Sequence, residues 1–165
     1  MTEFRRVALK TGVTLNVVLA GPADAPPVIL LHGFPESHRT WREIAPRLGD
    51  RFRLIMPDQR GYAGSDKPSG KANYKTDILV DDVFALADAL GVEQFALVGH
   101  DWGGAVAWGA VLRHDPRIQR LAIVNSPHPV IFAKTLIEDS DQRAASQYIN
   151  AFKAPGFERF IRIKG

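Results

Sequence analysis

The sequence predicts an α/β domain with a mostly parallel sheet and helices on both faces. Short apolar runs alternate with helical stretches along the chain, and some of these runs, such as residues 28–31, contain no polar residue. Strands that are apolar throughout are typical of parallel sheets covered by helices on both faces. The length of 165 residues fits one domain, and a hydrophobic content of 45% is enough for a sizeable core.

The elements are expected in the following order. A hairpin with strands at 4–9 and 13–20 begins the sheet, so the sheet starts antiparallel. The remaining strands are predicted at residues 28–31, 53–56, 95–98 and 118–124. Helices are predicted at residues 39–48, with a cap near Ser37 and a late interruption at Pro46, at 75–90, and from 105 to about 113. Residues 59–70 are expected to form a loop.

Beyond residue 129 the pattern changes, because no strand signal follows. Helices are expected at 144–152 and 157–163, separated by the breaking sequence Ala-Pro-Gly at 154–156. We therefore expect residues 1–129 to form a core and residues 130–165 to begin a helical insertion over the sheet.

The chain is organised around residues 99–103, with the sequence Gly-His-Asp-Trp-Gly, between the strand at 95–98 and the following helix. This spacing is that of a nucleophile elbow, with Asp101 where Ser is usual. A carboxylate needs no deprotonation at neutral pH and can displace a leaving group from a saturated carbon. The resulting ester must then be hydrolysed, which requires an oxyanion hole and an activated water. The simpler alternative is that Asp101 only caps the helix.

Composition excludes several classes of function. The net charge is +3, but the basic residues are scattered among 18 acids, so no nucleic-acid surface is indicated. The absence of cysteine excludes disulfides and thiolate chemistry. The first residues lack the apolar core of a secretion signal, and no run is long enough to span a bilayer, so we expect a cytoplasmic protein. Neither a cofactor nor a metal site is indicated.

Several segments together resemble the epoxide hydrolase branch of the α/β-hydrolase superfamily, which carries an Asp nucleophile. Residues 32–37 resemble the family's oxyanion loop, and residues 99–104 resemble its elbow. Residues 58–66 resemble a loop motif of the family, except that Ala63 stands where Gly is more usual. Residues 125–129 resemble the segment that precedes the cap. Tyr148, followed by Phe152, resembles the stretch that supplies one of two lid tyrosines. The resemblance implies an incomplete α/β-hydrolase fold with the start of a helical cap.

The resemblance also implies a role for individual residues. Asp101 would open an epoxide to form an alkyl-enzyme ester, which water hydrolyses to a diol. Tyr148 would hydrogen-bond the epoxide oxygen as the ring opens. The backbone N–H groups of Phe34 and Trp102 would form the oxyanion hole. The residues expected to line the substrate site are His32, Pro35, Trp102 and His128.

Some of these residues have structural interpretations as well. His32 is expected to brace its loop, and His100 to point away from the cavity. Trp41 and Trp108 are expected to pack in the core. The polar residues expected to form a network that stabilises their own loop are Asp58, Arg60 and Asp66.

The family's catalytic His, its acid partner and the second lid tyrosine follow the cap and have no counterpart among the five histidines or elsewhere in this sequence. We therefore expect the alkylation half of the site without the hydrolysis half. The chain would then be a fragment, a truncated product, or one part of a two-chain assembly. Its partners would be a small epoxide or organohalide and either a second copy or a second chain that completes the fold.

Two alternatives stay open. The first is a haloalkane or haloacid dehalogenase on the same scaffold, but Phe34 and Tyr148 favour the epoxide. Haloalkane dehalogenases more often have Asn at position 34, and fluoroacetate-type enzymes have Arg where this chain has Trp102. The second is a non-catalytic remnant or an assembly module, which the missing catalytic His supports.

Overall fold

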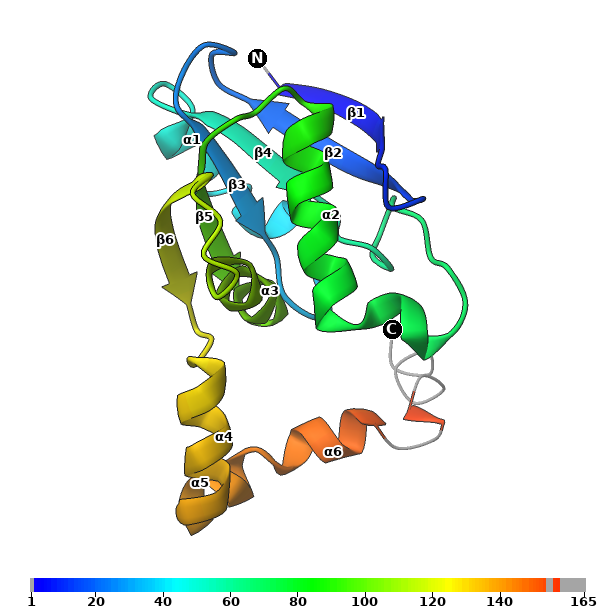
Figure 1. Cartoon of the computed structure of the whole chain (residues 1–165), viewed down its shortest axis with the longest axis vertical. Helices are drawn as coiled ribbons and strands as arrows, with labels where there is room; N and C mark the ends of the chain where they lie inside the picture. The colour runs from blue at the N-terminus through cyan, green and yellow to red at the C-terminus, as the bar shows by residue number, and fades with distance from the viewer. Residues whose placement is uncertain (1, 154–155, 158–165) are drawn as a thin grey trace. The chain divides into compact units, whose positions relative to one another are not determined.

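The computed structural model of the chain describes residues 2–153 and 156–157 (Figure 1). In chain order the elements are β1 (Thr2–Ala8), β2 (Thr14–Ala20), β3 (Pro27–Leu31), the 3₁₀ helix η1 (His38–Trp41), α1 (Ala45–Leu48), β4 (Arg53–Pro57), the 3₁₀ helix η2 (Lys71–Tyr74), α2 (Thr76–Ala89), β5 (Phe95–His100), α3 (Trp102–Val111), β6 (Ile118–Val124), α4 (Pro129–Glu138), α5 (Ser140–Ala145) and α6 (Gln147–Lys153). Contacts divide the chain after Ser126 into a first unit and a second unit.

The first unit is built on a six-stranded sheet in the order β1-β2-β4-β3-β5-β6. The pairs β1–β2 and β2–β4 are antiparallel, whereas β4–β3, β3–β5 and β5–β6 are parallel. This confirms a mostly parallel sheet with an antiparallel start. Because the carboxyl ends of parallel strands meet at one edge, the loops after β4, β3 and β5 are neighbours.

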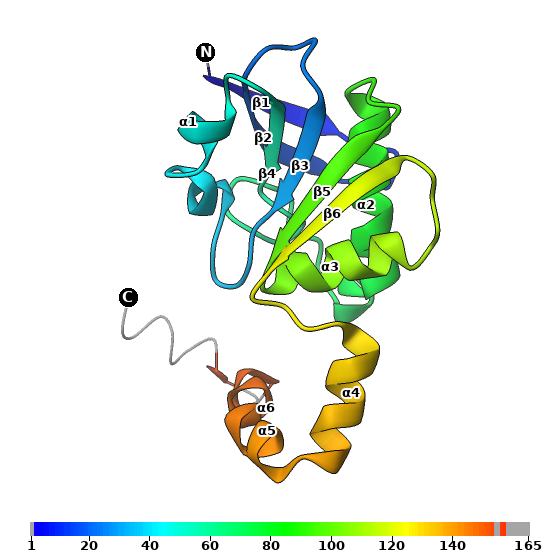
Figure 2. The ribbon, with the colours of Figure 1, turned by 90° about the vertical axis from the view of Figure 1, so that its left-hand side faces the viewer.

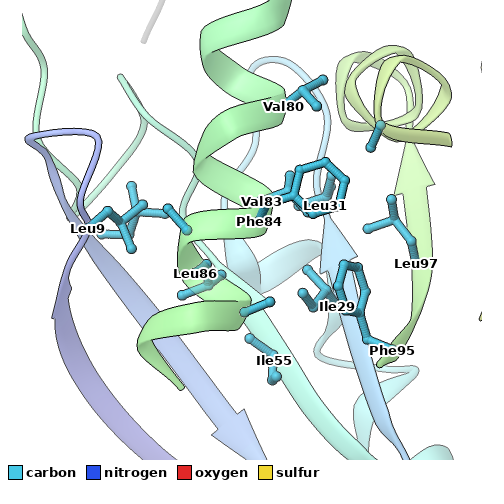
Figure 3. Packing of buried hydrophobic residues seen from close by; sticks show 14 of the residues in the cluster. Leu9, Ile29, Leu31, Ile55, Val80, Val83, Phe84, Leu86, Phe95 and Leu97 are labelled. Carbon is cyan, nitrogen blue, oxygen red and sulfur yellow. The ribbon is translucent and has the colours of Figure 1, made fainter. Parts of the chain in front are cut away.

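Helices cover both faces of the sheet, as expected (Figure 2). Alternate residues of β3 point to opposite faces, so Ile29 and Leu31 join one apolar cluster and Val28 and Leu30 join the other. The larger cluster lies under α2 and α3 (Figure 3). The smaller cluster is covered from η1, whose Trp41 is only 3% exposed. Burial on both faces explains why β3 has an unbroken apolar sequence.

The helix expected at 39–48 is not continuous. The chain forms η1, and α1 begins separately at Ala45 with Pro46 in its first turn. Proline is tolerated there because the first N–H groups of a helix have no partner within the helix. Pro46 therefore starts a helix rather than interrupting one. The expected cap is confirmed, since Ser37 Oγ accepts a hydrogen bond from Arg39 N at 3.3 Å.

The second unit, within the part that the structure describes, contains only helices. The sequence did not predict α4, and the helix expected at 144–152 is divided between α5 and α6 at Ser146. The side chain of Asp139 explains the start of α5, because it accepts hydrogen bonds from Asp141 N and Gln142 N at 2.8 and 3.0 Å. The helix expected at 157–163 lies outside the described residues, apart from residue 157. None of the helices in the described ranges has the length and apolar character needed to cross a bilayer.

Candidate active site

Asp101 occupies a strained turn between β5 and α3, with φ 51° and ψ −119°. A positive φ is unfavourable for a residue with a side chain. Neighbouring glycines make the turn sterically feasible. A Cβ on Gly103 would lie 2.3 Å from Leu31 O, and one on Gly99 would lie 2.5 Å from Gly103 O. The strand–turn–helix context expected for an elbow is therefore present.

The carboxylate of Asp101 does not cap α3, which it precedes. Its Oδ1 instead accepts a hydrogen bond of 2.8 Å from Phe34 N, in the loop after β3. A Cβ on Gly33 would lie 2.6 Å from Asp101 Cβ and 2.8 Å from its Oδ1, so only glycine permits this approach. The geometry favours a functional carboxylate over a simple helix cap.

Two backbone N–H groups are neighbours of Asp101: that of Phe34 in space, and that of Trp102 along the chain. Phe34 N–H bonds to Asp101 Oδ1 directly. Trp102 is the first residue of α3, so its N–H has no acceptor one turn earlier and belongs to the positive end of the helix dipole. The side chain of Trp102 is 49% exposed. The groups expected to form an oxyanion hole therefore adjoin the proposed nucleophile.

His32 lies at the end of β3 with 0% exposure. Its Nδ1 is 2.8 Å from Gly33 O, and its Nε2 accepts a hydrogen bond of 3.0 Å from Gln59 N. Gln59 Nε2 in turn donates to His32 O at 2.6 Å. Burial lowers the pKa of His32 and favours the neutral ring. Because protein atoms occupy both ring nitrogens, the geometry supports a brace rather than a substrate contact.

Glu36 is a residue of the site that the sequence reasoning missed. Its Oε2 accepts a hydrogen bond from Gly33 N and lies opposite His100 Nδ1, each at 3.0 Å. Burial alone would raise the pKa of Glu36, but the bonds from Gly33, Thr40 and His100 outweigh it and lower the pKa. Glu36 thus ties the loop after β3 to the residue before Asp101. This contact gives His100 a structural partner.

Asp58 is 1% exposed and holds three segments together. Its carboxylate accepts hydrogen bonds from His38 N at 2.9 Å, Asn16 Nδ2 at 2.8 Å and Gly64 N at 3.1 Å, and it lies 2.8 Å from His38 Nδ1. Burial acts to raise the pKa of Asp58, but these hydrogen bonds together lower it. Asp58 therefore anchors the far end of the loop after β3.

The expected network of Asp58, Arg60 and Asp66 needs correction. Arg60 Nε and Nη2 bond to the two carboxylate oxygens of Asp82 in α2, each at 2.7 Å. Asp66 accepts from Thr14 N at 2.8 Å in β2 and also pairs with an arginine of β1. The three side chains do not bond to one another: Asp58 and Asp66 both fasten their loop to β2, whereas Arg60 fastens it to α2.

Tyr62 is a second residue that was missed. Its ring stands edge-on to His32, with centroids 4.8 Å apart and planes at 81°. Burial and the negative charge of Asp101 raise the pKa of Tyr62 to about 12, so the phenol is neutral at physiological pH. The aromatic residue in the loop after β4 was the only sequence signal for this contact.

The remaining expected residues occupy different surroundings. Pro35 is exposed next to Phe34 in the first unit. His128 is half-buried at the start of α4 in the second unit. Tyr148, in α6, is 55% exposed and stands edge-on to Phe152, with ring centroids 5.5 Å apart. Within residues 2–153 and 156–157, no cluster of three His, Asp or Glu side chains suits a metal ion.

Known proteins similar to this chain support the family suggested by these features. The profile of the α/β hydrolase fold matches residues 26–163. Epoxide hydrolase 4 of Homo sapiens is 34% identical over 151 residues, which are 92% of this chain and 42% of the relative. The AB hydrolase superfamily protein YfhM of Bacillus subtilis is 41% identical over 145 residues, which are 87% of this chain and 51% of that protein.

A solved structure gives a similar result. One of the epoxide hydrolases from metagenomes of hot environments matches with a TM-score of 0.93 and 53% identity, covering 99% of this chain and 55% of that one. The present chain thus spans about half the length of the curated relatives it matches. It belongs to the α/β-hydrolase fold family, and its relatives include epoxide hydrolases.

Proposed function

We propose that Asp101 opens an epoxide of a small molecule by nucleophilic attack and forms an alkyl-enzyme ester. The observation that carries this proposal is the 2.8 Å bond from Phe34 N to Asp101 Oδ1, at an elbow whose carboxylate caps no helix. The similarity to epoxide hydrolases supports the choice of substrate class.

In the first step, Asp101 Oδ2 attacks one epoxide carbon while Phe34 N–H holds Oδ1. A C–O bond forms, the C–O bond of the ring breaks, and the electron pair passes to the ring oxygen. Tyr148, a weak acid, is proposed to supply the proton that this oxygen takes. The product is an ester of Asp101 that carries a free hydroxyl on the neighbouring carbon.

In the second step, water attacks the carbonyl carbon of this ester. Negative charge then develops on Oδ1, where the N–H groups of Phe34 and Trp102 are proposed to stabilise it. Cleavage of the bond between Cγ and Oδ2 restores the carboxylate and releases the diol. Of the two protons of the attacking water, one passes to the departing alkoxide oxygen and the other, by way of the base, restores the phenol of Tyr148. This step requires a base to take a proton from water, and we assign that base to no residue of this chain. Pro35, Trp102 and His128 are proposed to line the substrate site, whereas we assign His32 a bracing role.

Mass spectrometry after incubation with styrene oxide tests the proposal. We expect the chain to gain the mass of one epoxide on the peptide that contains Asp101. Asp101→Asn should reduce adduct formation by at least about 10³-fold, because the amide is a poor nucleophile. The matched control Asp24→Asn changes an exposed acid and should leave adduct formation unchanged.

The other outcomes separate the alternative functions. Adduct formation from a primary bromoalkane but not from styrene oxide would favour a dehalogenase. Diol production with turnover would mean that another group supplies the base. A chain that is folded by circular dichroism, yet gives neither adduct nor diol with any of these compounds, would contradict the proposal and favour a non-catalytic module.

A further inference from the structure

The peptide group between Gly33 and Phe34 has a hydrogen-bond partner at its C=O and another at its N–H. Its oxygen, Gly33 O, lies 2.8 Å from His32 Nδ1 and accepts a hydrogen bond of 3.1 Å from Glu36 N. Its N–H, that of Phe34, donates to Asp101 Oδ1 at 2.8 Å. In a planar trans peptide the C=O and N–H bonds point in opposite directions. A group that holds the oxygen therefore also sets the direction of the N–H.

The partners of His32 permit only one form of its ring. Gln59 N–H points at Nε2 from 3.0 Å, so Nε2 must carry a lone pair. Gly33 O is an acceptor, so Nδ1 must carry the hydrogen. A doubly protonated ring would place two N–H groups against each other at Nε2. The neutral Nδ1–H tautomer is the form that satisfies both contacts.

The orientation of the ring is fixed as well. His32 is fully buried, the ring of Tyr62 packs against it in a T-shaped arrangement, and Gln59 Nε2 donates to the backbone oxygen of His32 at 2.6 Å. These contacts come from the loop after β4, whereas Asp101 follows β5. The loop after β4 thus acts on the oxyanion donor through His32.

We propose that His32 is a positioning residue that aims the Phe34 N–H at the Asp101 carboxylate by donating its Nδ1–H to Gly33 O. This inference rests on the proposed function, because the aimed N–H is the proposed oxyanion donor. His32 does not touch the substrate in this arrangement.

The first test needs no substitution. In the chain labelled with ¹⁵N in its histidine rings, NMR spectroscopy at pH 7.5 reports which ring nitrogen carries hydrogen. We expect a protonated Nδ1 and an unprotonated Nε2 for His32, with its ring signals assigned by through-bond correlations in a chain labelled with ¹³C and ¹⁵N. An Nε2–H tautomer or a charged ring would overturn the proposal, whether or not any variant folds.

The second test distinguishes the role of Nδ1 from the role of Nε2 in the His32 ring. His32→Asn can place an amide N–H near the position of Nδ1 and so restore the donor to Gly33 O. His32→Gln can place an amide oxygen near the position of Nε2 and restore only the acceptor for Gln59. We expect His32→Asn to retain the slow hydrogen exchange of the Phe34 amide, and His32→Gln to accelerate it about tenfold. The same substitutions at exposed His114 are the matched controls.

The rate of adduct formation with styrene oxide is the functional readout. His32→Gln should slow it about tenfold relative to His32→Asn. If the rate instead falls in both variants only as far as their stability falls, His32 has a general structural role. That result would contradict the proposal that His32 aims the Phe34 N–H. If the unmodified chain forms no adduct, the proposed function fails, but the ring tautomer and the Phe34 exchange rate still decide this inference.

Discussion

The two units of the chain differ in how their polar and apolar side chains are used. In the first unit, His32, Asp58 and Arg60 are each at most 4% exposed, and all are hydrogen-bonded. In the described part of the second unit, Ile131 is 60% exposed and Ile137 is 76% exposed. The first unit therefore builds the surroundings of Asp101 from its own residues, whereas the described helices of the second unit bury little apolar surface.

This difference has a physical consequence. Helices shorter than about 12–15 residues are marginal in water unless tertiary packing supports them. The helix α4 has 10 residues, and α5 and α6 have 6 and 7. Their stability must therefore come from packing. The hydrogen bonds around Asp101, the proposed nucleophile, join residues of the first unit.

The largest effect on stability is expected from breaking the buried ion pair of the first unit. Arg60 and Asp82 have side chains that are 3% and 6% exposed. Arg60→Met leaves the Asp82 charge buried without its partner, so the free energy of unfolding should fall by about 3–5 kcal/mol in a urea titration. The matched change in the second unit is Lys134→Met, which breaks a pair with side chains 67% and 62% exposed and should cost less than about 0.5 kcal/mol. Similar losses of unfolding free energy in the two variants would show that the two units do not differ in how much their ion pairs contribute to stability.

A steric change should affect the chemistry next most. Gly33→Ala would place a Cβ 2.6 Å from Asp101 Cβ, so the loop after β3 must move away. A displacement of about 1 Å can cost about 10²-fold in rate, and we expect a loss of that order in adduct formation. Gly156→Ala in the second unit meets no atom within 4 Å and should leave the rate unchanged. A normal rate for Gly33→Ala would show that the close approach is unnecessary.

Acidification should weaken the first unit in two stages. Burial lowers the pKa of His32 below 6.5, so the unfolded chain binds a proton at a pH where the folded chain does not. Stability therefore falls as the pH drops below about 6.5. Asp58 has a pKa below 3.8, since the hydrogen bonds to its carboxylate outweigh burial, and its contribution is lost as the pH falls through that range. Urea midpoints from pH 7.5 to 3 measure both stages.

The variant His32→Asn separates these stages, because it has no ring to titrate. It should lose the dependence on pH that begins below about 6.5 but keep the dependence that comes from Asp58 at lower pH. An unchanged profile in the upper range would assign that stage to another group.

The smallest effect is expected at Ala63, which has a positive φ of 36°. Glycine accepts such a conformation without strain, although it gives the unfolded chain more freedom. Ala63→Gly should therefore stabilise the chain by only about 0.5 kcal/mol in thermal unfolding. In the second unit a positive φ of 86° is occupied by glycine, at Gly156. Clear destabilisation of Ala63→Gly would show that the strain at this position is negligible.

Local sequence patterns predicted much of the fold. The unbroken apolar sequence of β3 and the spacing of apolar residues in α2 follow directly from burial, so these elements were placed within a residue or two. Helix boundaries were missed where a single residue is compatible with more than one local structure. Pro46 suggested an interruption but in fact starts α1, and Asp139 caps a helix that the apolar pattern did not reveal.

The sequence alone determined that Asp101 stands on an elbow, because the surrounding glycines and the strand and helix beside them are contiguous in the chain. Only the tertiary structure decided which groups contact the Asp101 carboxylate. Phe34 lies 67 residues away in the sequence, yet its N–H bonds to Asp101, and Gln59 reaches His32 across 27 residues. These partners meet because β4, β3 and β5 are adjacent in the sheet. Strand order is set by the packing of the whole core, and no local pattern of residues contains it.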